Sequence, residues 1–262
     1  MQPKLAGIVF DIDGTLLRGS VLLRGVPAVL DELRQRGLRL AFFTNDNREK
    51  TAVWSHRLNS LGIQVFPDEI ITSALVAAEF VAERYPASRI LPIGDVGLID
   101  ALQTKEVQLV GMEETADIVV MGKDPNFNQQ RLHDVCQQIW NGATFIATNN
   151  DPKMPVANGY IPGTGAMVNA VVYATGVQPL VTGKPALEAG RAVLTRMGLS
   201  ANELMIVGDQ LATDIQMGKA VGMKTVLVLT GTSSQTDVNI MPPEMQPDYV
   251  IPDLTYLLSL LD

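Results

Sequence analysis

Two aspartates separated by one residue, Asp11 and Asp13, follow an apolar stretch and precede Gly14-Thr15. The stretch 5–11 is short, apolar and partly β-branched, which is typical of a buried strand. Residues i and i+2 of a strand point to the same face, so both carboxylates would converge at its carboxyl end. Two carboxylates held close together disfavour each other's ionisation, and a bound cation or a shared proton relieves that cost.

Similar polar groups occur at three later places where predicted strands end. They are Thr44 with Asn45, Lys184, and Asp209 followed by Asp214. Ligands of open α/β sheets bind beyond the carboxyl ends of the strands. If these strands are parallel neighbours, carboxylates, a hydroxyl, an amide and an ammonium meet at one edge. Clustered oxygen ligands suit a hard cation such as Mg²⁺, and a lysine beside a metal suits a phosphoryl group.

Each of these segments, taken alone, also fits an ordinary structural role. Asp13-Gly14 is a common turn pair, and Thr44-Asn45 would cap a following helix. Gly183-Lys184-Pro185 reads equally well as a helix entry with proline in the first turn, and it lacks the spacing of a P-loop. A joint functional role is favoured over these separate structural roles, because all of the segments stand at the ends of predicted strands.

Strand and helix signals alternate along most of the chain, which predicts a mostly parallel sheet covered on both faces. A long polar loop rich in glycine and proline interrupts this pattern at 149–163, and a loop of that length is usually functional or disordered. The predicted strands span 5–11, 38–43, 70–72, 89–93, 117–121, 145–148, 180–185, 203–209 and 224–230. The predicted helices span 26–36, 47–61, 73–84, 96–103, 128–141, 165–175, 186–197 and 212–221.

The composition predicts a well-filled interior in a chain of 262 residues, long enough for two compact units. Hydrophobic residues make up 47%, the mean hydropathy is +0.16, and the net charge is -8. This balance argues against a nucleic-acid polymer as partner, because such binding needs a basic face. With Cys136 as the single cysteine, on what reads as a helix face, an internal disulfide is excluded and core packing is expected. The chain shows neither a signal peptide nor a membrane span, so we expect a cytoplasmic protein.

The motifs resemble, in order, those of the haloacid dehalogenase-like hydrolase superfamily. The resemblance rests on Asp11-Ile-Asp13-Gly14-Thr15, on Thr44, on Lys184, and on Gly208-Asp209 through Asp214. The layout is similar to the class IIA branch, the NagD-like and p-nitrophenyl phosphatases, and the likeness covers nearly the whole chain. Asp46 is a departure, since many relatives carry an uncharged residue there.

This resemblance implies a Rossmannoid, doubly wound parallel sheet as the core, with an inserted α/β cap domain that would shield the site. The core would comprise 1–74 and 180–262, and the cap 75–179. The implied activity is Mg²⁺-dependent hydrolysis of small phosphate monoesters, such as sugar phosphates, nucleotide monophosphates or p-nitrophenyl phosphate. The reaction would pass through an aspartyl-phosphate, and the partner would be a small phosphorylated metabolite.

The resemblance also assigns roles to the two aspartates that follow the first strand. Asp11 would be the nucleophile, and Asp13 would first protonate the leaving oxygen and then take a proton from water. Mg²⁺ would bind the side chains of Asp11 and Asp209 and the backbone carbonyl of Asp13. Asp214 would orient the waters of the metal without binding it directly.

The other polar residues at strand ends would hold the phosphoryl oxygens, and the long loop would meet the leaving group. Thr44, the Asn45 backbone and Lys184 are the expected phosphate contacts. In the loop 149–163, the residues Asn149, Asp151 and Lys153 are candidates for contacts with the leaving group. A solvated connector fits that loop equally well.

Two alternatives keep the same fold. A phosphotransferase or phosphomutase would use the same nucleophile but pass the phosphoryl group to an acceptor other than water. A non-catalytic phosphate- or metal-binding module would keep the fold but would not need Asp13. The sequence leaves the substrate and any assembly into a homo-oligomer open.

Overall fold

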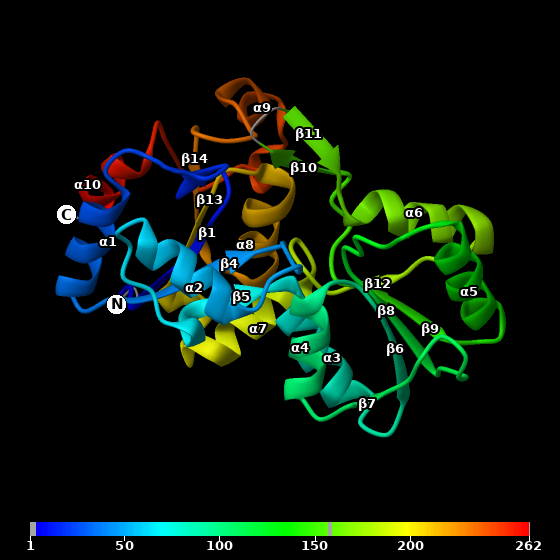
Figure 1. Cartoon of the computed structure of the whole chain (residues 1–262). Helices are drawn as coiled ribbons and strands as arrows, with labels where there is room; N and C mark the ends of the chain where they lie inside the picture. Colours follow the sequence, from blue (N-terminus) through cyan, green and yellow to red (C-terminus); the bar gives the residue numbers. More distant parts are fainter. Residues whose placement is uncertain (1–3, 157–158, 262) are drawn as a thin grey trace. The chain divides into compact units, whose positions relative to one another are not determined.

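The computed structural model describes residues 4–156 and 159–261, and the chain folds into two compact units. Unit 1 comprises Met1–Thr44, Ala52–Ile71 and Lys184–Asp262, and unit 2 comprises Asn45–Thr51 and Thr72–Gly183. Figure 1 follows the chain through both units. The predicted division into a core and a cap at 75–179 stays a prediction.

Unit 1 is built on a six-stranded sheet with the order β15-β14-β13-β1-β4-β5. The pairs from β15 through β4 are parallel. Its strands are β1 (Gly7–Asp11), β4 (Arg39–Thr44), β5 (Ile70–Thr72), β13 (Leu204–Gly208), β14 (Lys224–Val228) and β15 (Tyr249–Ile251), and a hairpin of β2 (Leu17–Arg18) and β3 (Val21–Leu22) follows β1. Its helices are α1 (Val26–Gln35), α2 (Thr51–Ser60), α7 (Leu187–Met197), α8 (Gln216–Val221), α9 (Gln235–Ile240) and α10 (Leu257–Leu261).

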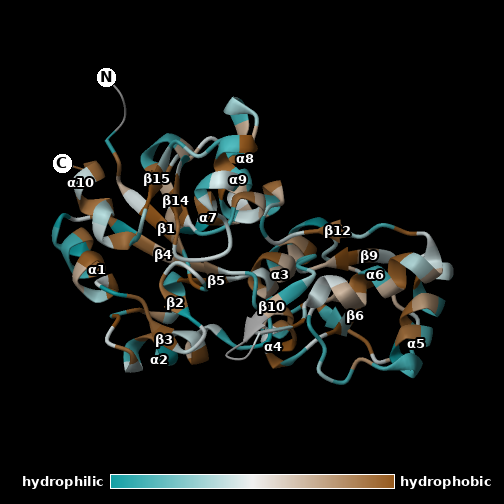
Figure 2. Ribbon diagram, turned by 90° about the horizontal axis from the view of Figure 1, so that it is seen from above, coloured by the Kyte–Doolittle hydropathy of each residue, from teal (hydrophilic) through white to brown (hydrophobic). Residues whose placement is uncertain are grey.

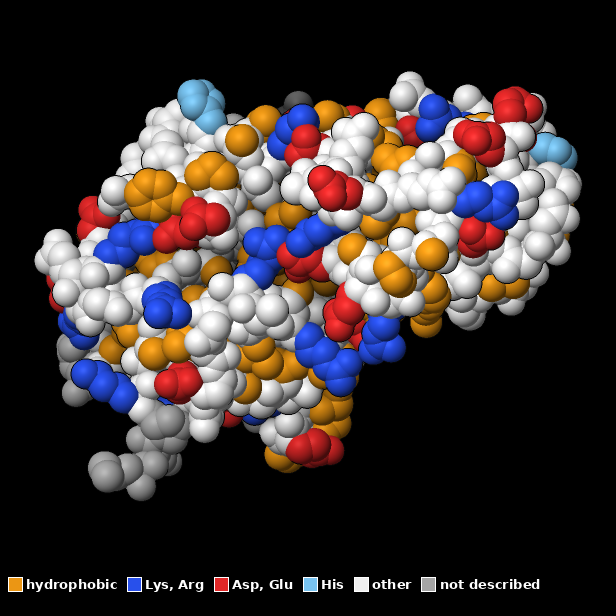
Figure 3. Space-filling view, turned by 90° about the horizontal axis from the view of Figure 1, so that it is seen from below, with side chains coloured by type: hydrophobic (Ala, Val, Ile, Leu, Met, Phe, Trp, Pro, Cys, Tyr) orange, Lys and Arg blue, Asp and Glu red, His pale blue; other side chains and the backbone are white. Residues whose placement is uncertain are grey.

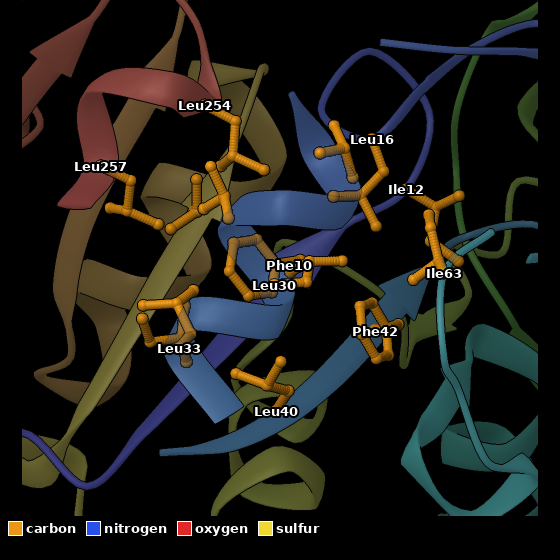
Figure 4. Packing of buried hydrophobic residues seen from close by; sticks show 14 of the residues in the cluster. Phe10, Ile12, Leu16, Leu30, Leu33, Leu40, Phe42, Ile63, Leu254 and Leu257 are labelled. Carbon is orange, nitrogen blue, oxygen red and sulfur yellow. The ribbon is translucent and has the colours of Figure 1, made fainter. Parts of the chain in front are cut away.

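Helices cover both faces of this sheet, because its strands are apolar on both sides. Alternate residues of β1, such as Ile8 and Phe10, face a core shared with α1, α2 and α10. In Figure 4, Leu30 and Leu33 of α1 lie over Phe10 and Leu40 of the sheet. On the opposite face, α7 and α8 pack together and α8 lies against β13. The arrangement confirms the predicted α/β class.

Unit 2 is a second α/β layer structure with its own five-stranded sheet, ordered β12-β9-β8-β6-β7 and parallel throughout. One core lies between the sheet and α5 and α6, and a second lies between the sheet and α3 and α4. Cys136 is buried in the first of these cores, as predicted. The strands are β6 (Arg89–Ile93), β7 (Gln108–Leu109), β8 (Ile118–Met121), β9 (Thr144–Ala147) and β12 (Leu180–Val181), and the helices are α3 (Ser73–Arg84), α4 (Val96–Thr104), α5 (Gln129–Trp140) and α6 (Thr164–Thr175).

Hydropathy follows this layering in both units. In Figure 2 the central strands are mostly brown, at the hydrophobic end of the scale, whereas the helices alternate between brown and teal. Helix α1 shows the reason, since its buried residues recur at helical spacing: Val26, Val29, Leu30 and Leu33.

Three predictions of local structure were wrong, in the segments 149–163, 47–61 and 180–185. The segment 149–163 is not an open loop, because it holds an antiparallel hairpin of β10 (Lys153–Val156) and β11 (Gly159–Pro162). Residues 157 and 158, between these strands, lie outside the described residues. The helix predicted over 47–61 begins only at Thr51, since the Asp46 side chain accepts the backbone N–H of Arg48 and holds a turn there.

The strand predicted over 180–185 also differs. Only Leu180 and Val181 are extended, and they pair with Ile146 and Ala147 of β9 in unit 2 rather than joining the sheet of unit 1. Gly183 donates its N–H to the Thr148 carbonyl and continues that pairing. Lys184 is the first residue of the last segment of unit 1. It therefore reaches the sheet edge from a connection and not from a neighbouring strand.

Replacing Leu33 by alanine tests the core between α1 and the sheet. Leu33 is fully buried there, so Leu33→Ala should lower the free energy of unfolding by about 2–5 kcal/mol. The measurement is chemical denaturation followed by circular dichroism. The control Leu187→Ala, at a residue that is 39% exposed, should cost less than about 1 kcal/mol. Equal losses in the two variants would contradict this account of the core.

Candidate functional site

Three adjacent parallel strands bring the predicted site residues together in unit 1. Strand β1 lies between β13 and β4, so the carboxyl ends of all three meet at one edge. Asp11 ends β1, Thr44 ends β4, and Asp209 follows β13. All three side chains are buried. The edge therefore concentrates polar groups in a place that water reaches poorly.

The ammonium group of Lys184 lies at the centre of this edge. Its Nζ is 2.6 Å from Asp11 Oδ1 and 2.7 Å from Asp214 Oδ1, and it also donates to the Phe43 carbonyl at 3.2 Å. Lys184 is only 2% exposed. A buried ammonium is tolerated when charged acceptors satisfy its hydrogens, and these three oxygens do so. Residues that are far apart in the sequence are thereby held in one cluster.

The Asp209 carboxylate is held by the loop that follows β14. Its Oδ2 accepts the backbone N–H of Thr232, and its carbonyl accepts the N–H of Ser233. Thr230 in the same loop donates its hydroxyl to the Gly14 carbonyl at 2.6 Å. We did not predict this loop as part of the site, although the sequence signal was present. Polar residues, Thr230 and Thr232, stand at the end of the predicted strand 224–230 and just after it, as they do at the other predicted strand ends.

The turn after β1 brings the backbone close to Asp209. The N–H of Gly14 donates to the Leu17 carbonyl, and the Leu17 N–H returns to Ile12. Gly14 has φ +93°, and a Cβ at this position would lie 2.5 Å from Asp209 Oδ2. Only glycine allows both the backbone conformation and this approach. Asp13 lies in the same turn, half-buried, and its backbone forms a bridge with Leu17.

The buried charges shift each other's titration. Burial raises the pKa of Asp11 well above its usual range, against the lowering effect of Lys184, and the charges of Asp214 and Asp209 add to the rise. Burial and the Asp214 charge raise the pKa of Asp209 to about 6, although hydrogen bonds from Thr232 oppose this. Burial lowers the pKa of Lys184, but the two carboxylates outweigh that effect and raise it overall. Lys184 therefore stays charged at neutral pH.

The donor set of this cluster fits a hard divalent cation. Ligand oxygens of Asp11, Asp209 and Asp214 all lie within 4.8 Å of one another, and all three residues are buried. Three carboxylates and one ammonium leave two negative charges, which a divalent cation would neutralise. Carboxylate oxygens are the ligands that Mg²⁺ prefers. The acidic group includes Asp214, which we had expected one step removed from the metal, and it does not include the Asp13 side chain.

Asn45 follows Thr44 directly but belongs by its contacts to unit 2. Its Nδ2 donates to Asp151 Oδ2 at 3.0 Å, and its carbonyl accepts the Ser73 hydroxyl at 2.7 Å. The neighbouring Asp46 is buried and forms a two-point ion pair with Arg48, at 2.9 and 2.6 Å. Asp46 is the residue that departs from the family pattern, and Arg48 of the same loop neutralises its charge.

The three candidates in the segment 149–163 differ in environment. Asn149 is 3% exposed and donates Nδ2 to Asp151 Oδ2 at 2.7 Å, so both side chains belong to the network that holds Asn45. Lys153 lies on the hairpin, with its Nζ 4.1 Å from the centre of the Tyr160 ring. Lys153 and Tyr160 are both exposed, so they are accessible to a ligand, whereas Asn149 is not.

The sequence matches proteins of known activity. A sequence profile described as haloacid dehalogenase-like hydrolase matches residues 8–108, and a HAD-hydrolase-like profile matches 181–257. The chain is 35% identical to the sugar-phosphatase AraL of Bacillus subtilis, over 94% of this chain and 89% of that protein. The chain belongs to the haloacid dehalogenase-like hydrolases. This hydrolase is also 33% identical to an acid sugar phosphatase of Staphylococcus epidermidis, over 97% of both chains.

Solved structures place the hydrolase in the NagD-like, class IIA branch. It is similar to a p-nitrophenyl phosphatase from Archaeoglobus fulgidus, with a TM-score of 0.90 at 31% identity over 98% of this chain and 100% of that one. It is similar to NagD from Escherichia coli, with 0.89 at 30% identity over 96% and 98%. A glycerol phosphate phosphatase from Mycobacterium tuberculosis, in complex with magnesium, gives 0.91 at 31% identity over 97% and 76%. The hydrolase is a phosphoric monoester hydrolase.

Surface charge is mixed on the face drawn in Figure 3. Lys and Arg side chains lie among Asp and Glu there, and neither sign covers a wide continuous area. That face does not present the broad basic surface that polyanion binding uses. No helix among the described residues combines the length and apolar character that crossing a bilayer requires.

Removing the buried ammonium should destabilise the hydrolase in a pH-dependent way. Lys184→Met leaves Asp11 and Asp214 without their shared cation, so the free energy of unfolding should fall by about 3–5 kcal/mol at neutral pH. The pKa of Asp11 is already raised, and without Lys184 it rises further. The loss relative to wild type should therefore be larger at about pH 8 than at about pH 5, where protonation relieves the repulsion.

The measurement is chemical denaturation at both pH values with a chelator present, so that bound metal does not compensate. Lys219→Met is the matched control, since its ion pair with Asp248 at 3.0 Å is partly exposed and should contribute at most about 1 kcal/mol. A loss in Lys184→Met no larger than in this control, or one that grows toward acid pH, would contradict the proposed electrostatics.

Proposed function

We propose that this hydrolase is a magnesium-dependent phosphatase that removes phosphate from small phosphate monoesters through an aspartyl-phosphate on Asp11. The observation that carries the proposal is the buried cluster at the end of β1. There, one Asp11 oxygen pairs with Lys184 and two further carboxylates lie within 4.8 Å. Carboxylate nucleophiles that form acyl-phosphates act in such surroundings, where cations neutralise the charge of the incoming phosphoryl group.

In the first step, an oxygen of Asp11 attacks phosphorus while the bond from phosphorus to the ester oxygen breaks. The phosphoryl group moves to Asp11, and the leaving alcohol oxygen takes a proton from Asp13. Asp13 suits this role because it stands two residues beyond Asp11, in the half-buried turn after β1, where it is partly accessible to solvent. The buried Asp11 is held by Lys184 and by the Thr15 hydroxyl at 3.4 Å.

In the second step, Asp13 takes a proton from a water molecule, whose oxygen attacks phosphorus. The bond between phosphorus and Asp11 breaks, and orthophosphate leaves with Asp11 restored as a carboxylate. Lys184 stabilises the negative charge that develops on the phosphoryl oxygens, together with Thr44 and the backbone of Asn45. The position of Thr44 supports its role, because Thr44 directly follows Phe43, the residue of β4 that pairs with Asp11 on β1.

Asp11 and Asp209 would hold Mg²⁺ with their side chains, and Asp13 with its carbonyl, while Asp214 would orient the waters of the metal. Bound Mg²⁺ supplies charge neutralisation at the phosphoryl oxygens and fixes their orientation. The pairing of Asp214 with both Lys184 and the Gln210 N–H supports its role as an orienting group. The magnesium complex of the similar glycerol phosphate phosphatase supports the choice of metal.

Sugar phosphates are the substrate class we propose first. The similar proteins are named as sugar, acid sugar, glycerol phosphate and p-nitrophenyl phosphatases, all of which act on small esters.

Replacing the nucleophile tests the chemistry. Asp11→Asn should lower kcat for p-nitrophenyl phosphate by roughly 10⁴-fold or more, because an amide does not form the acyl-phosphate. The measurement is the rate of orthophosphate release with Mg²⁺ present, combined with mass spectrometry of acid-quenched wild type for phosphate on Asp11. Asp134→Asn, on the surface of α5, is the control and should leave kcat unchanged. Turnover near the wild-type rate in Asp11→Asn would remove the nucleophile assignment.

Magnesium should stabilise the protein more at alkaline than at acid pH. The pKa of Asp209 is raised to about 6, so its contribution to folding stability falls as pH rises through the carboxyl range to about 6. A divalent cation bound to the Asp209 carboxylate neutralises its charge as a proton would, and it does so at a pH where the carboxylate is ionised. The increase in melting temperature on adding MgCl₂ should therefore be larger at about pH 8 than at about pH 5.

A chelator should abolish both this increase and the phosphatase activity. Asp209→Asn should remove most of the increase at both pH values, and Asp248→Asn, a surface acid of the same unit, should keep it. Full activity in the presence of excess chelator would remove the metal from the proposal.

A further inference from the structure

Asn47 is a buried amide in the short segment Asn45–Thr51, which follows β4 but belongs to unit 2. It is 1% exposed, and no sequence pattern singles it out, because it falls in the segment 47–61, for which a helix is predicted. A buried amide needs partners for its nitrogen and its oxygen, since an unsatisfied group costs free energy. The partners of Asn47 therefore show what this residue holds.

Both ends of the Asn47 side chain bond to segments distant in sequence. Its Nδ2 lies 3.0 Å from Thr148 Oγ1 and 3.0 Å from Asn149 Oδ1, and these acceptors use its two hydrogens. Its Oδ1 accepts the backbone N–H of Lys123 at 2.7 Å. The amide therefore ties the segment to the ends of β8 and β9.

The same network continues from Asn47 to Asn45. Asn149, whose oxygen accepts from Asn47, donates its own Nδ2 to Asp151 Oδ2 at 2.7 Å. That carboxylate oxygen also accepts Asn45 Nδ2 at 3.0 Å. The Asn45 carbonyl is held by the Ser73 hydroxyl at 2.7 Å and lies 3.3 Å from Asn47 Nδ2. Both the side chain and the backbone of Asn45 are thereby fixed.

The surrounding backbone leaves the segment no room to shift. A Cβ at Gly97 would lie 2.6 Å from the Asn47 carbonyl oxygen, and one at Gly122 would lie 2.6 Å from Asn47 Oδ1. Gly97 also donates its N–H to the Arg48 carbonyl at 2.8 Å. Such close approach from two sides indicates a single conformation for Asn47 and its neighbours.

We infer that Asn47 is a positioning residue for phosphate binding: through Thr148, Asn149 and Asp151 it holds the Thr44–Asn45 peptide where its N–H meets a phosphoryl oxygen. This inference rests on the proposed function, in which the Asn45 backbone is a phosphate contact. Asn47 itself touches no reacting atom. Donors for a transferring phosphoryl group act only when held within a fraction of an ångström, and a displacement of about 1 Å costs up to about 10²-fold in rate.

Asn47→Ala should therefore weaken phosphate recognition without unfolding the protein. We expect kcat/KM for p-nitrophenyl phosphate to fall by about 10-fold to 10²-fold, and the Kd of orthophosphate to rise by a similar factor. The measurements are steady-state kinetics and titration calorimetry with orthophosphate, well below the melting temperature. Asn59→Ala is the control, because Asn59 is an amide of unit 1 that, like Asn47, donates its side-chain N–H groups to acceptors in the protein, here the Ser55 and Val65 carbonyls. It should lower the melting temperature and leave both constants unchanged.

A second pair of variants covers the case in which Asn47→Ala does not fold. Thr148→Val removes one acceptor of the Asn47 amide, whereas Thr148→Ser keeps it. The valine variant should raise the Kd of orthophosphate, and the serine variant should restore the wild-type value. Equal constants in Asn47→Ala and wild type, or equal values in the valine and serine variants, would overturn the inference.

Failure of the proposed function gives a different result. A wild type that hydrolyses no phosphate ester but binds orthophosphate would end the proposed reaction, and the Kd comparison would still decide the role of Asn47. A wild type that does not bind orthophosphate would overturn the inference as well, because no phosphate contact would exist for Asn47 to position.

Discussion

The structure of the site depends on a single buried ammonium held between two carboxylates. Lys184 is almost inaccessible to water, and both Asp11 and Asp214 lie within 2.7 Å of its Nζ. Removing any one of the three would leave an uncompensated charge buried away from water, which costs several kcal/mol. Lys184, Asp11 and Asp214 lie far apart in the sequence. The fold must therefore bring all three together for their charges to be compensated.

The parallel sheet meets this constraint by a simple geometric route. Strands β13, β1 and β4 are neighbours; β1 and β4 end in the polar residues Asp11 and Thr44, and Asp209 directly follows β13. Apolar residues on both faces of the strands keep the rest of the sheet dry, which strengthens every electrostatic interaction at the edge. The turn after β1 completes the arrangement, because Gly14 lets the backbone pass close to Asp209. The hydrophobic core and the acidic cluster are thus two consequences of one strand order.

The sequence predicted the parts of the site that strand ends supply, and it missed those that tertiary contacts supply. Asp11, Thr44 and Asp209 were found because each follows an apolar run, and such runs are local signals. Lys184 was predicted to end a strand of the same sheet as Asp11. That premise was wrong, because the short strand β12 pairs with β9 of unit 2 instead. Asn47 gave no local signal at all: its partners Lys123, Thr148 and Asn149 are distant in sequence, and only folding brings them together.

The inclusion of Asn45–Thr51 in unit 2 has a consequence for exchanging parts between related enzymes. A chimaera made by transplanting the long insertion alone, from Thr72 to Gly183, would separate the donor's buried amide network from the short segment that completes it. The recipient's own residues at 45–51 would then face foreign partners at Gly97 and Gly122, where there is no spare volume. The segments Asn45–Thr51 and Thr72–Gly183 would therefore have to be exchanged together, although Ala52–Ile71 of unit 1 separates them in the sequence.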